Sequence, residues 1–139
     1  MNAHVELVRT AVERVAREGS HSLLEHYDEV FTPDFLWKPT LIGSFESAEY
    51  HGREGFARYL SDFEASFAEW TARDPSYRAV ADDVVVAHVR MAVRGTESGV
   101  PIEQEIGWVF RFEGDRIACG EAFLSWAEAD AVAEGRAHA

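Results

Sequence analysis

Positive charge is scarce in this chain of 139 residues. Lysine and arginine together number 13, against 25 aspartate and glutamate residues, so the formal net charge at pH 7 is −12. An acidic chain of this kind repels the phosphate backbone of DNA and RNA, and we therefore expect no nucleic-acid partner. Lys38 is the only lysine.

Cysteine, long apolar runs and leader-like segments are also sparse. Cys119 is the only cysteine, so no internal disulfide can form, which fits a reducing compartment. No stretch approaches the ~20 consecutive apolar residues that a membrane-spanning helix needs. The first residues include the charged Glu6 and Arg9 where a secretory leader would be apolar. We therefore expect a cytoplasmic protein without a membrane partner.

The composition that remains is that of a packed globular domain. Hydrophobic residues make up 47% of the chain and aromatic residues 12%. A chain of this length buries about two-thirds of its unfolded surface in one core. We therefore predict a single domain spanning residues 1–139.

Alternating apolar and charged residues predict three antiparallel strands, at 84–94, 102–112 and 116–125. Turn-forming segments at 95–101 and 113–115 join them. Each strand places its apolar residues on one parity, so the resulting meander has one apolar face and one charged face.

Helical spacing of apolar residues predicts a first helix at 4–18, which Gly19 ends, and a short second helix that ends near Asp28. A brief strand at 35–37 stops at Pro39, and a loop follows over 40–51. Another helix starts at Gly52 and carries one aromatic face. That face consists of Phe56, Tyr59, Leu60, Phe63 and Phe67.

Two further segments complete the chain. Residues 70–81 are predicted as a strand that Asp74 and Pro75 interrupt, and 127–134 as a short terminal helix with a frayed tail at 135–139. Helices followed by a long bent sheet predict an α+β fold. We expect a cone in which a curved antiparallel sheet wraps around a long helix, with two further N-terminal helices, and whose mouth forms a pocket.

Several segments together carry a resemblance to a known family. They are the first helix ending at Gly19, residues 24–37, the motif YHGREGF at 50–56, SGVP at 98–101 and WVFRFEGDRI at 108–117. In this order and spacing the chain resembles the SnoaL-like branch of the nuclear transport factor 2-like superfamily. That superfamily includes ketosteroid isomerases, polyketide cyclases and limonene epoxide hydrolase. The resemblance implies the cone fold and a pocket but leaves the chemistry open.

Catalytic positions can be carried over from that resemblance one residue at a time. Relatives similar to ketosteroid isomerase use a tyrosine, an aspartate base and a protonated aspartic acid. The corresponding positions here hold Val12, Lys38 and Trp108. The acidic position of the SnoaL-type cyclases falls on Ala122, or on Glu121 if the register shifts by one. Whether the chain is an enzyme is therefore left open.

Strand parity assigns residues to the two faces of the sheet. Even-numbered residues of the strand that contains Trp108 point inward in this superfamily, and so do Gly120, Ala122 and Leu124 on the last strand. On the strand at 84–94 the odd-numbered residues are apolar and are expected to point inward. The even-numbered His88 and Arg90 of that strand are therefore predicted on the convex face, unless a bulge turns them inward. Charged residues of the neighbouring strands share that face and can pair with them.

The predicted pocket is aromatic and mostly apolar. Its expected ligand-binding residues are Trp37, Tyr50, Tyr59, Phe63, Val89, Met91, Trp108, Phe110, Ala122 and Leu124. Lys38, His51 and Tyr59 are the candidate catalytic residues, because each could transfer a proton or orient a ligand oxygen. No histidine pair has metal-ligand spacing and no glycine-rich phosphate loop occurs, so we expect neither metal nor cofactor.

Three functional hypotheses follow. The first is binding of a hydrophobic or aromatic small molecule in the cone pocket. The second is a cyclase, isomerase, dehydratase or epoxide hydrolase that acts on a polyketide, steroid or terpenoid-like substrate with an unusual residue set. The third is a non-catalytic dimerisation module, and in this superfamily the convex sheet face commonly forms a homodimer interface.

Overall fold

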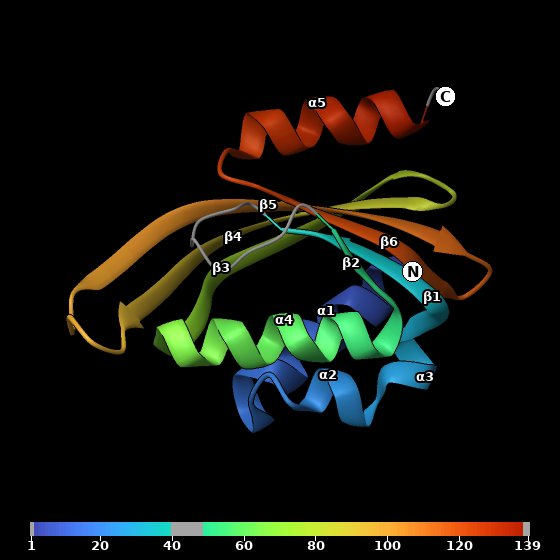
Figure 1. The fold of residues 1–139 in the computed structure, drawn as a ribbon. Coiled ribbons are helices and arrows are strands. Elements are labelled where there is room, and N and C mark those ends of the chain that lie inside the picture. The colour runs from blue at the N-terminus through green and yellow to red at the C-terminus, as the bar shows by residue number, and fades with distance from the viewer. Residues whose placement is uncertain (1, 40–48, 138–139) are drawn as a thin grey trace.

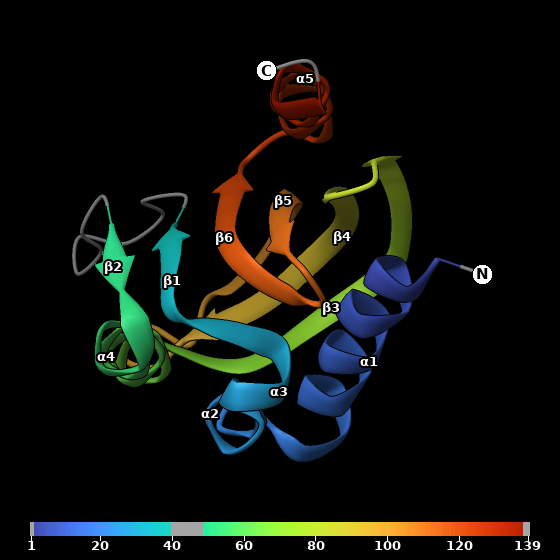
Figure 2. The same cartoon turned by 90° about the vertical axis from the view of Figure 1, so that its right-hand side faces the viewer.

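A computed structural model describes residues 2–39 and 49–137 and has an α+β fold built around one curled sheet (Figures 1 and 2). The elements in chain order are α1 (Ala3–Glu18), α2 (Ser22–Glu25), α3 (Tyr27–Val30), β1 (Phe31–Lys38), β2 (Tyr50–His51), α4 (Gly52–Ser66), β3 (Phe67–Ala81), β4 (Val84–Gly95), β5 (Pro101–Glu113), β6 (Arg116–Phe123) and α5 (Trp126–Ala137). The predicted α+β cone is confirmed. Among the described residues, no helix is both long and apolar enough to cross a membrane.

The six strands lie in the order β2-β1-β6-β5-β4-β3. All neighbours are antiparallel except β1 and β6, which run parallel. The prediction of a purely antiparallel sheet is therefore wrong at this one pair. Antiparallel order follows from a tight hairpin, whereas β1 meets β6 through a long crossover that leaves the direction free.

The predicted meander is present as β4, β5 and β6, with boundaries within two residues of those expected. Its register pairs Val85 with Phe110 and Trp108 with Ala122, which places the predicted apolar parity on one face. Strand β3 is longer than expected and continues through Asp74, whose φ is 49°, with a register shift next to it. A local irregularity therefore absorbs the Asp74-Pro75 break without ending the strand.

The N-terminal helices differ from the prediction in one respect. Helix α1 ends at Gly19, whose φ of 98° favours glycine and whose amide donates to Val15 O. The short second helix is two helices, α2 and α3, because His26 between them leaves helical geometry. At its start, α1 is capped by Asn2 Oδ1, which accepts from Val5 N at 3.1 Å.

The C-terminal helix is longer than expected and runs to Ala137, so the predicted frayed tail is wrong over residues 135–137. Residues 138–139 lie outside the described residues. So do residues 40–48, which include most of the predicted loop, and the end of that loop, Tyr50–His51, forms β2.

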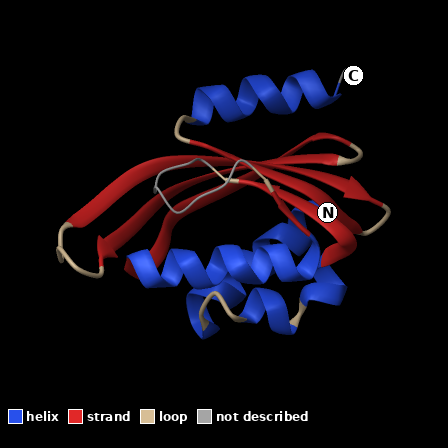
Figure 3. Ribbon diagram, viewed as in Figure 1, coloured by secondary structure: helices blue, strands red, loops and turns tan. Residues whose placement is uncertain are grey.

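Helices cover both faces of the sheet (Figures 1 and 3). Helices α1 to α4 lie against the concave face and enclose the main core, whereas α5 crosses the convex face. Beneath α5 a second cluster is built from Val84, Val86, Val109, Ala129 and Ala133. Ala129 and Ala133 are fully buried there, so α5 packs closely on the sheet.

Candidate functional site: an apolar cavity in the cone

A cavity of about 460 Å³ opens between the concave face of the sheet and helices α1 and α4. The wall is mostly aliphatic and aromatic. It consists of Val8, Ala11, Val12, Val15, Gly19, Ser20, Leu23, Val30, Phe31, Phe35, Trp37, Phe56, Tyr59, Leu60, Phe63, Glu64, Phe67, Ala68, Trp70, Met91, Ile106, Trp108, Phe110, Ile117 and Ala122. Its volume lies within the ~300–1,000 Å³ that small-molecule sites commonly occupy.

Aromatic rings from four elements meet in this wall. Trp37 on β1 lies edge-on to Tyr59 on α4, with ring centroids 5.7 Å apart. Trp70 on β3 lies nearly parallel to Trp108 on β5 at 6.5 Å. Helix α4 contributes aromatic rings because Phe56, Tyr59 and Phe63 lie on one face of the helix at its 3.6-residue period, and that face is buried.

Polar groups in the wall are few. Trp37 is 8% exposed, and its buried Nε1 has no hydrogen-bond partner among the described residues. Ser20 Oγ donates to Glu64 Oε1, and Glu64 is the only ionised side chain among the described residues of the wall. The described wall therefore offers apolar surface and, at Glu64, a carboxylate.

Most of the residues expected to bind a ligand come together in this cavity. Its wall contains Trp37, Tyr59, Phe63, Met91, Trp108, Phe110 and Ala122 from the predicted set. Tyr50 and Val89 are instead buried in the core around the cavity, and Leu124 lies beyond β6 and is 45% exposed. Whether the wall residues bind a ligand stays a prediction.

Two of the three candidate catalytic residues lie away from the cavity. His51 is exposed at the start of α4, where its Nε2 pairs with Glu49 Oε2 at 3.3 Å. Lys38 follows Trp37 on β1 and pairs in register with Glu121. Successive strand residues point to opposite faces, so Lys38 faces away from the cavity that Trp37 lines.

Cys119 lies on the same side of the sheet as Lys38 and Glu121. Burial raises the pKa of the Cys119 thiol, and the nearby Glu121 carboxylate raises it further, while Lys38 acts in the opposite direction. A thiol with a raised pKa forms little thiolate at neutral pH. Cys119 is buried on β6 and is not among the residues of the cavity wall.

Three positions at which catalytic relatives keep functional groups do lie in the wall. Val12, Trp108 and Ala122 all line the cavity. The correspondence with catalytic positions of relatives stays a prediction, and each of the three carries a side chain that cannot act as a carboxylic acid or a phenol. Tyr59 is the candidate catalytic residue that remains in the cavity.

Sequence analysis missed the contribution of α1 and of the wall carboxylate. Val8, Ala11 and Val15 are the buried residues of α1, and all three line the cavity. Their helical spacing was visible, but an apolar stripe looks the same whether it meets other side chains or empty space. No sequence motif marks Glu64 as a residue of the cavity wall. Its position between Phe63 and Phe67, both on the predicted aromatic face, was the only indication in the sequence.

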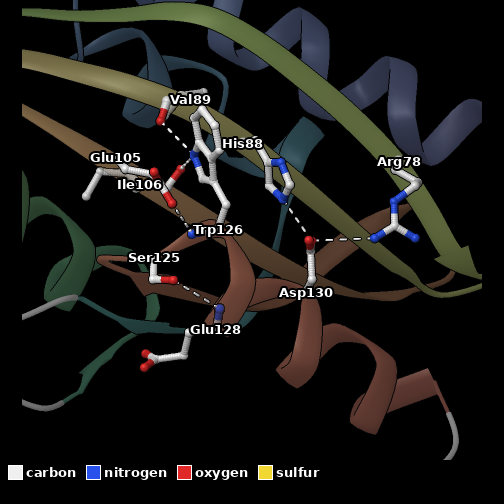
Figure 4. Close-up of polar contacts among 9 residues, drawn as sticks. All are labelled: Arg78, His88, Val89, Glu105, Ile106, Ser125, Trp126, Glu128 and Asp130. Carbon is white, nitrogen blue, oxygen red and sulfur yellow. Dashed lines mark hydrogen bonds and ion pairs between the residues drawn. The ribbon is translucent and has the colours of Figure 1, made fainter.

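The convex face holds a separate polar cluster around α5 (Figure 4). The indole of Trp126 stacks on the His88 imidazole, with centroids 5.2 Å apart and planes 7° from parallel, and Arg90 lies 5.2 Å from the indole centroid. Trp126 Nε1 donates to Val89 O and Ile106 O, both at 3.1 Å. His88 and Arg90 therefore lie on the convex face, as their parity predicted, and bind α5.

Asp130 extends this cluster along the helix. Its Oδ1 lies 2.7 Å from His88 Nε2 and 3.4 Å from Arg78 Nη2 (Figure 4). At the helix start, Glu105 Oε1 accepts from Trp126 N at 2.7 Å. A homodimer through the convex face stays a prediction, and such an interface would have to include α5 or displace it.

Within residues 2–39 and 49–137, no group of three or more His, Cys, Asp and Glu side chains gathers in a way that could hold a metal ion.

The curled sheet, its helices and the enclosed cavity define the class of protein. A nuclear transport factor 2-like protein of unknown function from Burkholderia pseudomallei K96243 has the same fold, with a TM-score of 0.74 at 18% identity over 96% of this chain and 98% of that one. A candidate polyketide cyclase from Xanthomonas campestris pv. campestris gives a TM-score of 0.73 at 17% identity, over 91% and 93% of the two chains.

A third similar structure is a protein with the ketosteroid isomerase-like fold from Catenulispora acidiphila DSM 44928, solved with trimethylamine. Its TM-score is 0.70 at 16% identity, over 92% of each chain. Likeness at these identities establishes a shared fold and leaves function open. No curated protein matches the sequence.

The sequence itself settles the family. It matches the model of the SnoaL-like domain over residues 8–119, which is most of the chain. The protein belongs to the SnoaL-like domain family.

Proposed function

We propose that this protein binds one hydrophobic small molecule with aromatic or fused rings, of the size of a polyketide or terpenoid metabolite, inside the cone. The observation that carries the proposal is the cavity of about 460 Å³ whose wall is almost entirely apolar. Removing apolar surface from water contributes about 25 cal/mol per Å², so a molecule that fills such a space gains most of its affinity from burial.

The indole of Trp37 supports a polar anchor within this site. Within the described part of the chain its buried Nε1 has no hydrogen-bond partner, and an unpaired buried donor costs roughly 1–3 kcal/mol. A ligand carbonyl or hydroxyl oxygen would accept that hydrogen bond if the Trp37 ring turned its Nε1 toward the cavity. We therefore expect the ligand to carry at least one acceptor among its rings.

A cyclase-like reaction is the second candidate function. It is supported by membership of the SnoaL-like family, by the candidate polyketide cyclase among the similar structures and by the Tyr59 hydroxyl in the wall. A phenol can donate a hydrogen bond to a developing enolate. Recovery of the bound molecule distinguishes the two functions, because a binding protein returns its ligand unchanged.

The binding proposal can be tested with N-phenyl-1-naphthylamine, a neutral aromatic dye that fluoresces in apolar surroundings. We expect saturable enhancement with one dye bound per chain. The variant Ala122→Trp places an indole in the cavity, since Ala122 lines it, and should abolish dye binding.

The matched control is Ala131→Trp, which adds the same group at an exposed position of α5. This variant should bind the dye as the native protein does. Thermal unfolding of both variants checks that the fold is retained. Equal dye binding by the native protein and a folded Ala122→Trp variant would refute the proposal.

A further inference from the structure

We propose that the ligand of this cavity is cationic. It has an apolar body that fills the cavity and a tertiary or quaternary ammonium group that lies beside Glu64. This inference rests on the proposed binding function and specifies the chemical class of the ligand. It follows from the charge and the aromatic surface of the wall.

The charge of the wall has one sign. Glu64, on the last turn of α4, is the only ionised side chain among the described residues that line the cavity. Residues 40–48, whose placement is not described, contain Glu46 in their sequence and no lysine, arginine or histidine. No basic side chain of the described wall therefore offsets the Glu64 carboxylate.

The nearest arginines of the same helix are engaged elsewhere. Arg53 Nη1 donates to Leu24 O at 2.8 Å, and the Arg58 guanidinium lies over the Tyr50 ring at 5.3 Å. Among the described residues, Glu64 accepts a hydrogen bond from Ser20 Oγ, and a neutral hydroxyl leaves the carboxylate charge in place. Glu64 is exposed, so a bound molecule that extends its cationic group toward the solvent side of the wall would meet this carboxylate.

The aromatic surface favours the same charge. Phe63 precedes Glu64 directly and Phe67 follows it three residues later; both line the cavity with it, and their ring centroids are 5.2 Å apart. Trp70 and Trp108 form a further part of the wall. Ring faces attract an ammonium group through their quadrupole, and tryptophan attracts it most strongly. The same faces repel an anion, so the wall selects against a carboxylate or phosphate ligand.

These features predict an order of affinity among ligands of equal length. A trimethylammonium head gains from both Glu64 and the rings, an uncharged hydroxyl head gains at most a hydrogen bond to Glu64, and a carboxylate head is repelled by both. We expect decyltrimethylammonium to displace N-phenyl-1-naphthylamine at a concentration about tenfold or more below that of decanoate, with decanol between them. The titrations use pH 7 and 0.15 M salt, so that distant charges are screened.

Variants of Glu64 test whether this residue causes the preference for cationic over anionic ligands. Glu64→Gln removes the carboxylate and should reduce the advantage of decyltrimethylammonium over decanoate by about fivefold, whereas Glu64→Asp keeps the charge and should retain it. Glu134→Gln changes the net charge by the same amount at an exposed position of α5, on the opposite side of the sheet, and should alter nothing.

The outcomes separate the two claims. If the dye does not bind the native protein, the proposed binding function fails. If the dye binds but the three ligands displace it equally, or decanoate displaces it best, the binding function stands and the cationic ligand is refuted. If Glu64→Gln and Glu134→Gln reduce the preference to the same extent, net charge causes it and the placement beside Glu64 is wrong.

Discussion

Gly107 on β5 permits α5 to lie on the convex face, and Gly107→Ala tests that packing. A Cβ at this position would lie 2.4 Å from Ala129 Cβ and 3.3 Å from Ser125 O. Ordinary contacts begin near 3.4 Å, so the helix must move outward by about 1 Å. Overpacking of this kind costs about 1–3 kcal/mol, and the reduced freedom of the unfolded chain offsets about 0.4–1 kcal/mol of it.

We therefore expect Gly107→Ala to lower the free energy of unfolding by about 1–2 kcal/mol, which lowers Tm by roughly 3–8 °C for a domain of this size. Urea unfolding followed by circular dichroism measures the change. The control is Gly135→Ala at the other end of α5, where an added Cβ meets nothing within 4 Å. That variant should be neutral or stabilising by up to about 1 kcal/mol, because alanine favours helix.

A second substitution makes the test specific. Ala129→Gly removes the methyl group that an alanine at 107 would strike. On its own it should destabilise the protein, since it weakens the helix and loses a buried methyl. In the double variant it should recover part of the loss, with a coupling energy of about 1 kcal/mol or more. An unchanged Gly107→Ala midpoint, or strictly additive effects, would refute this account of the packing.

Two further predictions concern ionisable groups outside the cavity. Burial, and the nearby Glu13 carboxylate, raise the pKa of Tyr77 to about 12, while Arg9 opposes the shift. Because the folded-state pKa exceeds the usual 10, the stability associated with the neutral phenol is complete below pH 10 and is lost between pH 10 and 12. Tm of Tyr77→Phe should therefore fall less over that interval than Tm of the native protein, and parallel curves would contradict the assignment. Asp130→Ala removes the contacts with His88 and Arg78 and should destabilise by about 0.5–1.5 kcal/mol in urea. Glu134→Ala, at an exposed position of the same helix, is its control, and equal effects would show that the Asp130 contacts add nothing.

The meander was predictable because its two faces differ. One face of β4 and β5 is buried against the concave core, so apolar and charged residues alternate and fix both the strands and the parity of Trp108. The direction of β1 was not predictable in this way. Residues 31–38 pair parallel with β6, and the local sequence of a strand does not determine which neighbour it meets after a long crossover.

The cavity could be predicted only in part. Seven expected residues line it because strand parity and the aromatic face of α4 set their direction. The empty volume depends on how far α1 and α4 stand from the sheet, which no residue pattern states. The direction of Lys38 could also have been predicted, since Trp37 and Lys38 are adjacent on one strand and their side chains point to opposite faces.

The role of α5 was underestimated for a different reason. The sequence prediction began the helix at residue 127 and left Trp126 outside it, whereas Trp126 is its first residue and stacks on His88. Contacts between β4 and α5 join residues far apart in the chain, and a single sequence does not reveal such pairs. Parity placed His88 and Arg90 on the correct face but could not supply their partner.

A crystal structure of the protein with N-phenyl-1-naphthylamine tests the central claim most directly. We predict one dye molecule inside the cone, with its rings against Trp37, Tyr59 and Trp108 and its contacts on the concave side of the sheet. A dye that binds in solution but lies on the convex face beside α5, or at the surface, would contradict the proposal that the cavity is the binding site.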